Sequence, residues 1–165
     1  MENIIFVGFM GSGKTSVGSL LAKDLNFKFI DSDFEIEKDL SLSINDIFKI
    51  YGEKYFRDLE INFLKKISKI NNIVISLGGG TFCSDENIKL IKKIGRTIYL
   101  KTSYSELLKR YSSIQIEKRP LLKDKNLTEI LLKEREYYYS QADFCILTDA
   151  LSLQEVKHQA YKLIL

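Results

Sequence analysis

The sequence predicts an α/β fold in which a parallel sheet lies between two layers of helices. Two observations predict it. Short apolar runs rich in β-branched and aromatic residues recur along the chain, and longer segments with helical periodicity separate them. Short runs of this kind are typical of strands buried on both faces. Alternating strands and helices favour right-handed crossovers, which place helices on both sides of one sheet.

Five strands are expected in chain order: Ile4–Val7, Lys28–Ile30, Ile73–Leu77, Thr97–Leu100 and Phe144–Leu147. The helices that follow the fourth and the fifth strand begin at capping signals, since Ser103 is followed by Glu106 and Ser152 by Glu155. In such pairs a side-chain oxygen accepts hydrogen bonds from backbone N–H groups that lack a partner within the helix. Helical patterns also lie between the other strands, so that helices are expected to connect the strands of the sheet.

The composition is that of a single globular domain. With 165 residues, 45% hydrophobic and 28% charged, the chain is expected to form one domain, and disordered, collagen-like and low-complexity classes are excluded. No apolar run reaches the roughly 18 residues of a membrane span, and a motif that begins at Gly8 leaves no room for a leader peptide. We therefore expect a cytoplasmic protein without a membrane partner. Since no exposed apolar stripe is evident, we also expect a monomer.

The charge pattern argues against a nucleic-acid partner, because the net charge of +3 is spread along the chain without a dense basic segment. Arginine is rare in this lysine-rich chain. Since a planar guanidinium binds an anion through two parallel hydrogen bonds, each arginine is a candidate for such a task. The 25 cationic residues include five arginines: Arg57, Arg96, Arg110, Arg119 and Arg135.

The two cysteines, Cys83 and Cys145, carry no metal or disulfide signature. They lie far apart in the sequence, and neither has the spacing of a zinc site. We expect both to be small buried hydrophobic residues.

The first expected strand leads into a phosphate-binding motif. Gly8–Thr15 reads GFMGSGKT, which matches GxxxxGK[ST], and a helical pattern follows. Glycines allow successive backbone N–H groups to face phosphate oxygens, and the helix N-terminus adds its positive end. We expect Lys14 to neutralise the β and γ oxygens and the Thr15 hydroxyl to bind Mg²⁺. The expected ATP ligands of this segment are Gly11, Ser12, Gly13, Lys14, Thr15 and Ser16.

Nucleotide binding alone also fits a GTP-driven switch protein. Such proteins read guanine through NKxD and sense the γ-phosphate through DxxG, and the sequence contains neither motif. A kinase is therefore preferred, and we expect ATP to bind in preference to GTP.

Two further segments follow the second and third expected strands, at the edge where open α/β sheets collect their ligands. We expect Asp31 to face the metal through water and Asp33 to orient or deprotonate an acceptor hydroxyl. The alternative for either aspartate is a cap on the following helix. Gly78–Gly80 is expected to bring backbone N–H groups close to a ligand, with a tight turn alone as the alternative.

Two intervals interrupt the alternation of strands and helices. Residues 33–68 are expected to form an insertion of two or three helices, including Ile44–Tyr51 and another over about Glu53–Ile67, which could wall off a substrate. Residues 112–125 are polar and charged and contain Pro120, the only proline. A connection of this length is commonly functional or disordered, and we expect a mobile lid there.

Six motifs in register carry a resemblance: GFMGSGKT at Gly8–Thr15, DSD at Asp31–Asp33, YFRDLE at Tyr55–Glu60, GGG at Gly78–Gly80, RPLL at Arg119–Leu122, and RE with three tyrosines at Arg135–Tyr139. In order and spacing, from about Asn3 to Asp149, the chain resembles the shikimate kinase family. The resemblance implies ATP-dependent and Mg²⁺-dependent phosphorylation of the 3-hydroxyl of shikimate, within aromatic amino-acid biosynthesis. It also implies a nucleoside-monophosphate-kinase-like fold with sheet order 2-3-1-4-5.

The resemblance further implies roles for the acceptor residues. Asp33 contacts substrate hydroxyls, Arg57 and Arg135 hold the carboxylate, and the backbone of Gly78–Gly80 lies against the ring. Two guanidinium groups in a lysine-rich chain suit an anionic acceptor. A kinase of another small polyol or sugar acid, such as gluconate, remains the alternative function, and a non-enzymatic protein that retains ATP affinity is a weaker one.

The same resemblance assigns roles outside the acceptor site. Arg119 is the lid arginine that reaches the transferring phosphoryl group, with an ordinary solvated cation as the alternative. Arg110 is expected to stack on adenine, with a solvated helix end as the alternative. Glu60, one helical turn after Arg57, is expected to pair with it and hold the guanidinium in place, with a plain surface ion pair as the alternative. Residues 113–118 depart from the family, because they lack the Gly, Asp and Asn expected in the lid.

Overall fold

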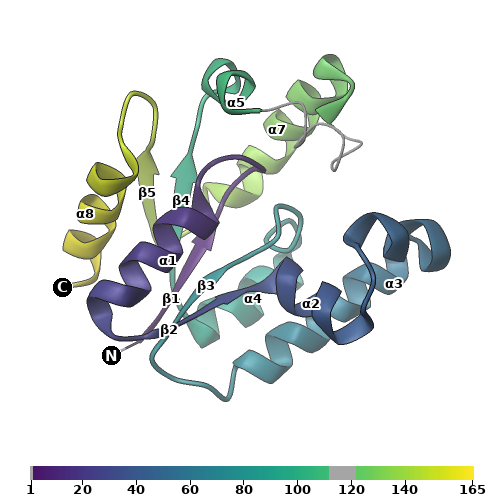
Figure 1. The fold of residues 1–165 in the computed structure, drawn as a ribbon, viewed down its shortest axis with the longest axis horizontal. Coiled ribbons are helices and arrows are strands. Elements are labelled where there is room, and N and C mark those ends of the chain that lie inside the picture. Colours follow the sequence, from purple (N-terminus) through teal and green to yellow (C-terminus); the bar gives the residue numbers. More distant parts are fainter. Residues whose placement is uncertain (1, 112–121) are drawn as a thin grey trace.

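The computed structural model describes residues 2–111 and 122–165. Within these residues the strands form one sheet in the order β2-β3-β1-β4-β5, with every neighbouring pair parallel. The strands are β1 Asn3–Val7, β2 Lys28–Asp31, β3 Ile73–Ser76, β4 Gly95–Lys101 and β5 Phe144–Leu147. Helices lie on both faces (Figure 1). The expected three-layer fold and its strand order are confirmed.

Alternate residues of β1 build the two halves of the core. Ile4 and Phe6 pack with α1 Lys14–Leu25 and α8 Leu153–Ile164 on one face. Ile5 and Val7 point to the other face, because successive side chains of a strand alternate. That face is covered by helices from the rest of the chain: α3 Ile44–Ile67, α4 Asp85–Ile94, α5 Tyr104–Arg110 and α7 Lys125–Tyr139.

The expected helical insertion after β2 is present as α2 Ser32–Leu40 and α3. The long helix α3 is broken at Gly52, whose φ of 82° and ψ of 172° are non-helical. This break falls where the sequence separates two helices. Ile36, Ile47 and Phe56 form a small core of their own between α2 and α3, which sit beside the sheet in Figure 1.

The helix starts follow the predicted caps. Ser103 accepts a hydrogen bond from the backbone N–H of Glu106, and Ser152 with Glu155 forms a complete capping box. Among the helices that the structure describes, none combines the length and the apolar character of a membrane span.

The prediction of two buried cysteines is wrong for Cys145, which is exposed, whereas Cys83 is half-buried. Cys145 lies on β5 at the edge of the sheet. Ile146 faces the side that helices cover, whereas Cys145 and Leu147 face the opposite side and are exposed. The apolar run that predicts the strand does not reveal that one face of an edge strand lacks a cover.

Gly95 begins β4 at a point of close backbone contact. It pairs with Asn3 across β1 and β4, and a Cβ atom added at Gly95 would lie 2.2 Å from the Asn3 carbonyl oxygen. The side chain of Asn3 is itself tied down, because its amide donates to Ile70 O at 2.7 Å and Ile94 O at 3.1 Å. The contact therefore has little room to relax.

We expect Gly95→Ala to lower the free energy of unfolding by about 2 kcal/mol or more, since overpacking against fixed backbone is costly. Urea unfolding measures the change, as a shift of midpoint at constant slope. Lys93→Ala on the exposed surface of α4 is the control and should stay within about 0.5 kcal/mol of the unmodified protein. An unchanged midpoint for Gly95→Ala would contradict the prediction.

Candidate active site

The carboxyl ends of β1, β2 and β3 bring three segments of the chain together. The phosphate motif follows β1, Asp31–Asp33 follows β2, and Gly78–Gly80 follows β3. The Thr15 hydroxyl donates to Asp31 Oδ2 at 2.7 Å, and Gly78 N–H donates to the Ser32 hydroxyl at 2.8 Å. The predicted nucleotide side and acceptor side are therefore in direct contact.

The phosphate motif curls around the Lys14 ammonium. Lys14 is 9% exposed, and its Nζ donates to Gly8 O at 2.8 Å and Phe9 O at 2.9 Å. Gly11 and Gly13 have φ values of 81° and 95°, which favour glycine. The first turn of α1 carries no acidic side chain, so that its N-terminus is available to an anion.

Two serines of the motif differ in exposure. Ser12 is 2% exposed, and its hydroxyl has no hydrogen-bond partner among the residues that the structure describes. Ser16 is exposed in the first turn of α1. Both lie where phosphate oxygens approach a helix N-terminus, as the sequence predicts for this motif.

Asp31 has two tasks in the structure. It caps α2, because its Oδ1 accepts from Asp33 N at 3.1 Å and Phe34 N at 3.2 Å. Its other oxygen accepts from Thr15. The capping alternative therefore applies to Asp31, and the same carboxylate also lies beside the hydroxyl predicted to bind Mg²⁺.

The oxygen donors at this point fit a magnesium ion, which prefers a few carboxylate or hydroxyl ligands together with water and phosphate. Thr15 Oγ1 is 3.3 Å from Ser76 Oγ, so that three oxygen-bearing side chains gather here, those of Thr15, Asp31 and Ser76. No group of three or more His, Cys, Asp or Glu side chains with metal-binding geometry occurs in residues 2–111 and 122–165. An ion held here would rely on nucleotide phosphates for the rest of its shell.

Each residue of the turn Gly78–Gly80 lies against the side chain of a different predicted substrate ligand. A Cβ atom at the first glycine would lie 2.5 Å from Oδ1 of Asp33, one at the second 3.1 Å from Nη1 of Arg135, and one at the third 2.6 Å from Nη1 of Arg57. None of the three glycines has a positive φ. The triple glycine therefore leaves space for three side chains to lie against its backbone, and the approach of its backbone N–H groups to a ligand stays a prediction.

The Arg57 guanidinium is held by carboxylates. Nη1 donates to Glu60 at 2.7 Å and Nη2 to Glu53 at 3.1 Å. Glu60 is 1% exposed and also accepts from the Thr81 hydroxyl at 2.5 Å. Burial lowers the pKa of Arg57, but the attraction of Glu60 and Glu53 outweighs it and raises the pKa above its ordinary value. The predicted pairing of Arg57 with Glu60 is present.

Arg135 is held differently from Arg57. Its guanidinium lies 5.8 Å from the centre of the Phe9 ring and against Gly79. Within the described ranges no carboxylate pairs with it. Both arginines line a cavity of about 340 Å³ between α3, α4 and α7, which Asp33 and Lys14 do not line. The two guanidinium groups therefore share one cavity, and Asp33 lies beside it at Gly78.

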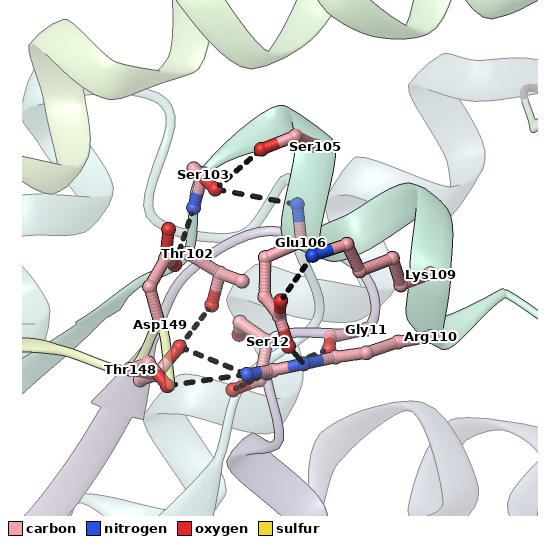
Figure 2. A network of polar contacts seen from close by, with 10 residues as sticks. All are labelled: Gly11, Ser12, Thr102, Ser103, Ser105, Glu106, Lys109, Arg110, Thr148 and Asp149. Atoms are coloured by element: carbon pink, nitrogen blue, oxygen red, sulfur yellow. Dashed lines mark hydrogen bonds and ion pairs between the residues drawn. The ribbon is translucent and has the colours of Figure 1, made fainter. Parts of the chain in front are cut away.

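The Arg110 side chain bridges the phosphate motif and the turn after β5, as Figure 2 shows. Its Nε donates to Glu106 at 3.1 Å, its Nη2 to Thr148 O at 3.3 Å, and its Nη1 lies 3.5 Å from Gly11 O and Ser12 O. The alternative of a solvated helix end is therefore wrong. This position is on the nucleotide side of the site, and stacking on adenine stays a prediction.

Arg119, Pro120 and most of the expected lid lie in residues 112–121, outside the described residues. At the end of the expected lid, residues 112–125, Asp124 is the N-cap of α7 and Lys125 begins the helix. Leu122 is buried.

Several supporting residues lack a signal in the sequence. Ser32 is fully buried under Gly78, Thr81 is fully buried beside Glu60, and the Tyr111 hydroxyl donates to Met10 O at 2.8 Å on the phosphate motif. Their partners are distant in the sequence, so that no local pattern marks them. Only the position of Ser32 between two aspartates could have drawn attention to it.

The family model for shikimate kinase matches residues 10–164. The chain belongs to the shikimate kinase family. Membership identifies it as a kinase enzyme with a nucleotide-binding P-loop. A shikimate kinase from Thermodesulfovibrio yellowstonii is 43% identical over 165 residues, which cover 98% of this chain and 94% of the relative. One from Caldicellulosiruptor saccharolyticus is 44% identical over 155 residues, covering 92% of this chain and 89% of the relative.

Solved structures of shikimate kinases agree with this assignment. The enzyme from Acinetobacter baumannii, solved in complex with shikimate, has 33% sequence identity and a TM-score of 0.93, covering 99% of this chain and 93% of that one. A gluconokinase from Sinorhizobium meliloti has a TM-score of 0.62 at 17% identity, covering 96% of this chain and 89% of that one. That likeness shows the shared fold alone, so that the gluconate alternative is not favoured over the shikimate kinase family.

Proposed function

We propose that this chain transfers the γ-phosphoryl group of ATP to the 3-hydroxyl of shikimate, in aromatic amino-acid biosynthesis. The observation that carries the proposal is the turn Gly78–Gly80. Its three residues lie against one carboxylate and two guanidinium groups, beside a phosphate-binding motif. A small molecule with hydroxyl groups and one carboxylate matches this set of partners. The related enzyme from Acinetobacter baumannii is described with shikimate bound.

On the nucleotide side, Lys14 exchanges its bonds to loop carbonyls for bonds to phosphate oxygens when ATP binds. The exposed N-terminus of α1 orients the same phosphates. Mg²⁺, held by Thr15 and through water by Asp31, would neutralise part of the charge on the β and γ oxygens. Positioning and charge stabilisation are the main means by which a protein accelerates phosphoryl transfer.

On the acceptor side, Asp33 accepts a hydrogen bond from the attacking hydroxyl and takes its proton as the new oxygen–phosphorus bond forms and the bond to the ADP oxygen breaks. Arg57 and Arg135 hold the carboxylate of the acceptor. The two arginines contribute unequally, because Glu60 and Glu53 already balance the charge of Arg57. Arg135 supplies most of the positive charge that the acceptor meets.

Arg119 completes this proposal as a donor to the transferring phosphoryl group. We expect Arg119→Ala to lower kcat about a hundredfold, the typical cost of losing one donor to a developing negative charge. The KM for shikimate should change less than kcat, since Arg57 and Arg135 bind the ground state. Steady-state kinetics test this, with Lys118→Ala as a neighbouring control. An unchanged kcat would contradict the assignment.

The proposed function is tested by ADP release in a coupled assay with ATP and Mg²⁺. The acceptors are shikimate, quinate, gluconate and a nucleoside monophosphate, each assayed separately. Activity with shikimate and much weaker activity with the others is expected. Activity confined to gluconate or to the monophosphate would overturn the proposal.

The expected monomer stays a prediction, but one of its arguments is wrong. Helix α7 exposes Leu127, Ile130 and Tyr137, with exposed fractions of 58%, 52% and 69%, on one face. The sequence did not reveal this stripe, because the same helix buries Leu132 and Tyr139 on its opposite side. Light scattering on the purified protein measures the oligomeric state directly.

A further inference from the structure

Tyr139 is the last residue of α7 and is fully buried. Its ring packs against Tyr99 of β4, with centroids 5.2 Å apart. Tyr139 is the last of three consecutive tyrosines, and the first of them, Tyr137, is instead 69% exposed. A buried phenol needs a partner for its hydroxyl group, and the identity of that partner indicates what the residue does.

The partner of the Tyr139 hydroxyl is the acceptor turn. The hydroxyl donates to Gly79 O at 2.5 Å, and the Cys83 thiol, a weaker donor, reaches the same oxygen at 3.5 Å. A Cβ atom added at Gly79 would lie 3.1 Å from Arg135 Nη1 and 3.7 Å from Tyr139 Oη. The phenol oxygen and the guanidinium therefore converge on the same glycine.

Arg135 and Tyr139 are four residues apart on one helix, which places them on the same face. Burial raises the pKa of the Tyr139 phenol well above its ordinary value, and the charge and hydrogen bonding of Arg135 oppose that rise only in part. The hydroxyl stays protonated and donates to Gly79, which leaves its lone pairs for the guanidinium. Arg135 has no carboxylate to fix it in the described ranges, whereas Arg57 has two.

We propose that the Tyr139 hydroxyl is the positioning group that holds Arg135 against the Gly79 backbone, ready for the carboxylate of the acceptor. Tyr139 performs for Arg135 the task that Glu60 performs for Arg57, but without cancelling its charge. The inference rests on the proposed function, since Arg135 is the acceptor ligand there. Tyr139 itself need not touch the substrate.

The test is Tyr139→Phe, which keeps the ring and removes only the hydroxyl group. The KM for shikimate should rise roughly five- to tenfold, as expected for the loss of one buried hydrogen bond, while kcat and the KM for ATP stay within about twofold. Tyr99→Phe, the other half of the aromatic pair, is the matched control and should leave all three constants within about twofold. An unchanged KM for shikimate in Tyr139→Phe, or an equal rise in Tyr99→Phe, would overturn the inference.

A double-mutant cycle separates positioning from general loosening. With Arg135→Ala already present, Tyr139→Phe should raise the KM for shikimate much less than it does alone, because the group to be positioned is gone. Full additivity would count against the inference. The proposed function fails in a different way, namely if the unmodified protein releases no ADP with shikimate. The two failures can therefore be told apart.

A measurement on the unmodified protein covers the case in which Tyr139→Phe is too unstable to assay. The Tyr139 hydroxyl proton, held by Gly79, should exchange slowly with water and be visible by NMR. Its resonance should shift when shikimate is added without nucleotide. A resonance that is unchanged by saturating shikimate would overturn the inference.

Discussion

Replacing Asp33 with asparagine is expected to lower kcat by about a thousandfold or more, since proton transfer and orientation of the hydroxyl are both lost. The amide keeps the shape of the side chain but cannot accept the hydroxyl proton. The affinity for ATP should stay within about twofold, because Asp33 lies against Gly78 on the acceptor side of the site. Isothermal titration with an ATP analogue and steady-state kinetics separate the two effects.

The control for Asp33→Asn is Glu35→Gln, the same loss of a carboxylate in the same first turn of α2. It should leave kcat within about twofold, which excludes a general effect of charge at this helix end. Retained turnover in Asp33→Asn would remove Asp33 from the chemical step. It would leave the shikimate kinase family assignment untouched, since that does not depend on the role of one residue.

Replacing Arg135 with alanine is expected to reduce kcat/KM for shikimate by about a thousandfold, the upper range for truncating one partner of a close charge pair. Within the described ranges Arg135 has no carboxylate partner, whereas Arg57 has two. The positive charge of Arg135 is therefore available to the carboxylate of the acceptor. Its removal also leaves no buried anion behind. Arg57→Ala would instead strand Glu60, which is 1% exposed, and would destabilise the fold as well.

Two comparisons make the Arg135→Ala result specific. Arg96→Ala, which removes a surface ion pair with Glu2, should change kcat/KM less than twofold. A neutral amide of shikimate should lose far less rate than shikimate itself on going to Arg135→Ala, because it has no charge for the guanidinium to bind. Equal losses for both acceptors would show that Arg135 does not bind the carboxylate.

The fold could be predicted because its signals are local. Every residue of β1 is buried, so that the run that predicts it is uniformly apolar after Asn3. The break at Gly52 lies at a glycine between two amphipathic segments. Strand β4 begins at Gly95, earlier than predicted, because its pairing with Asn3 is a contact between distant parts of the chain.

The sequence could predict which residues form the site but not the contacts between them. The motif around Lys14 and the arginines are visible as residue types, and family spacing connects them. That Arg57 is neutralised and Arg135 is not depends on contacts such as Thr81 with Glu60, which no periodicity encodes. The exposed side of Cys145 and the stripe on α7 were missed for the same reason, since cover by a neighbour is a property of the tertiary structure.

The glycine run after β3 has a consequence for the evolution of the chain. We expect three adjacent codons to be constrained there for three separate reasons, because a methyl group at each would push against a different side chain of the site. Alanine at any of them would have to move that side chain out of its place, although the backbone angles would permit alanine. Gly52 is the opposite case, where the backbone angle restricts substitution and, apart from neighbouring residues of its own helix, no atom of residues 2–111 or 122–165 lies within 4 Å of an added Cβ.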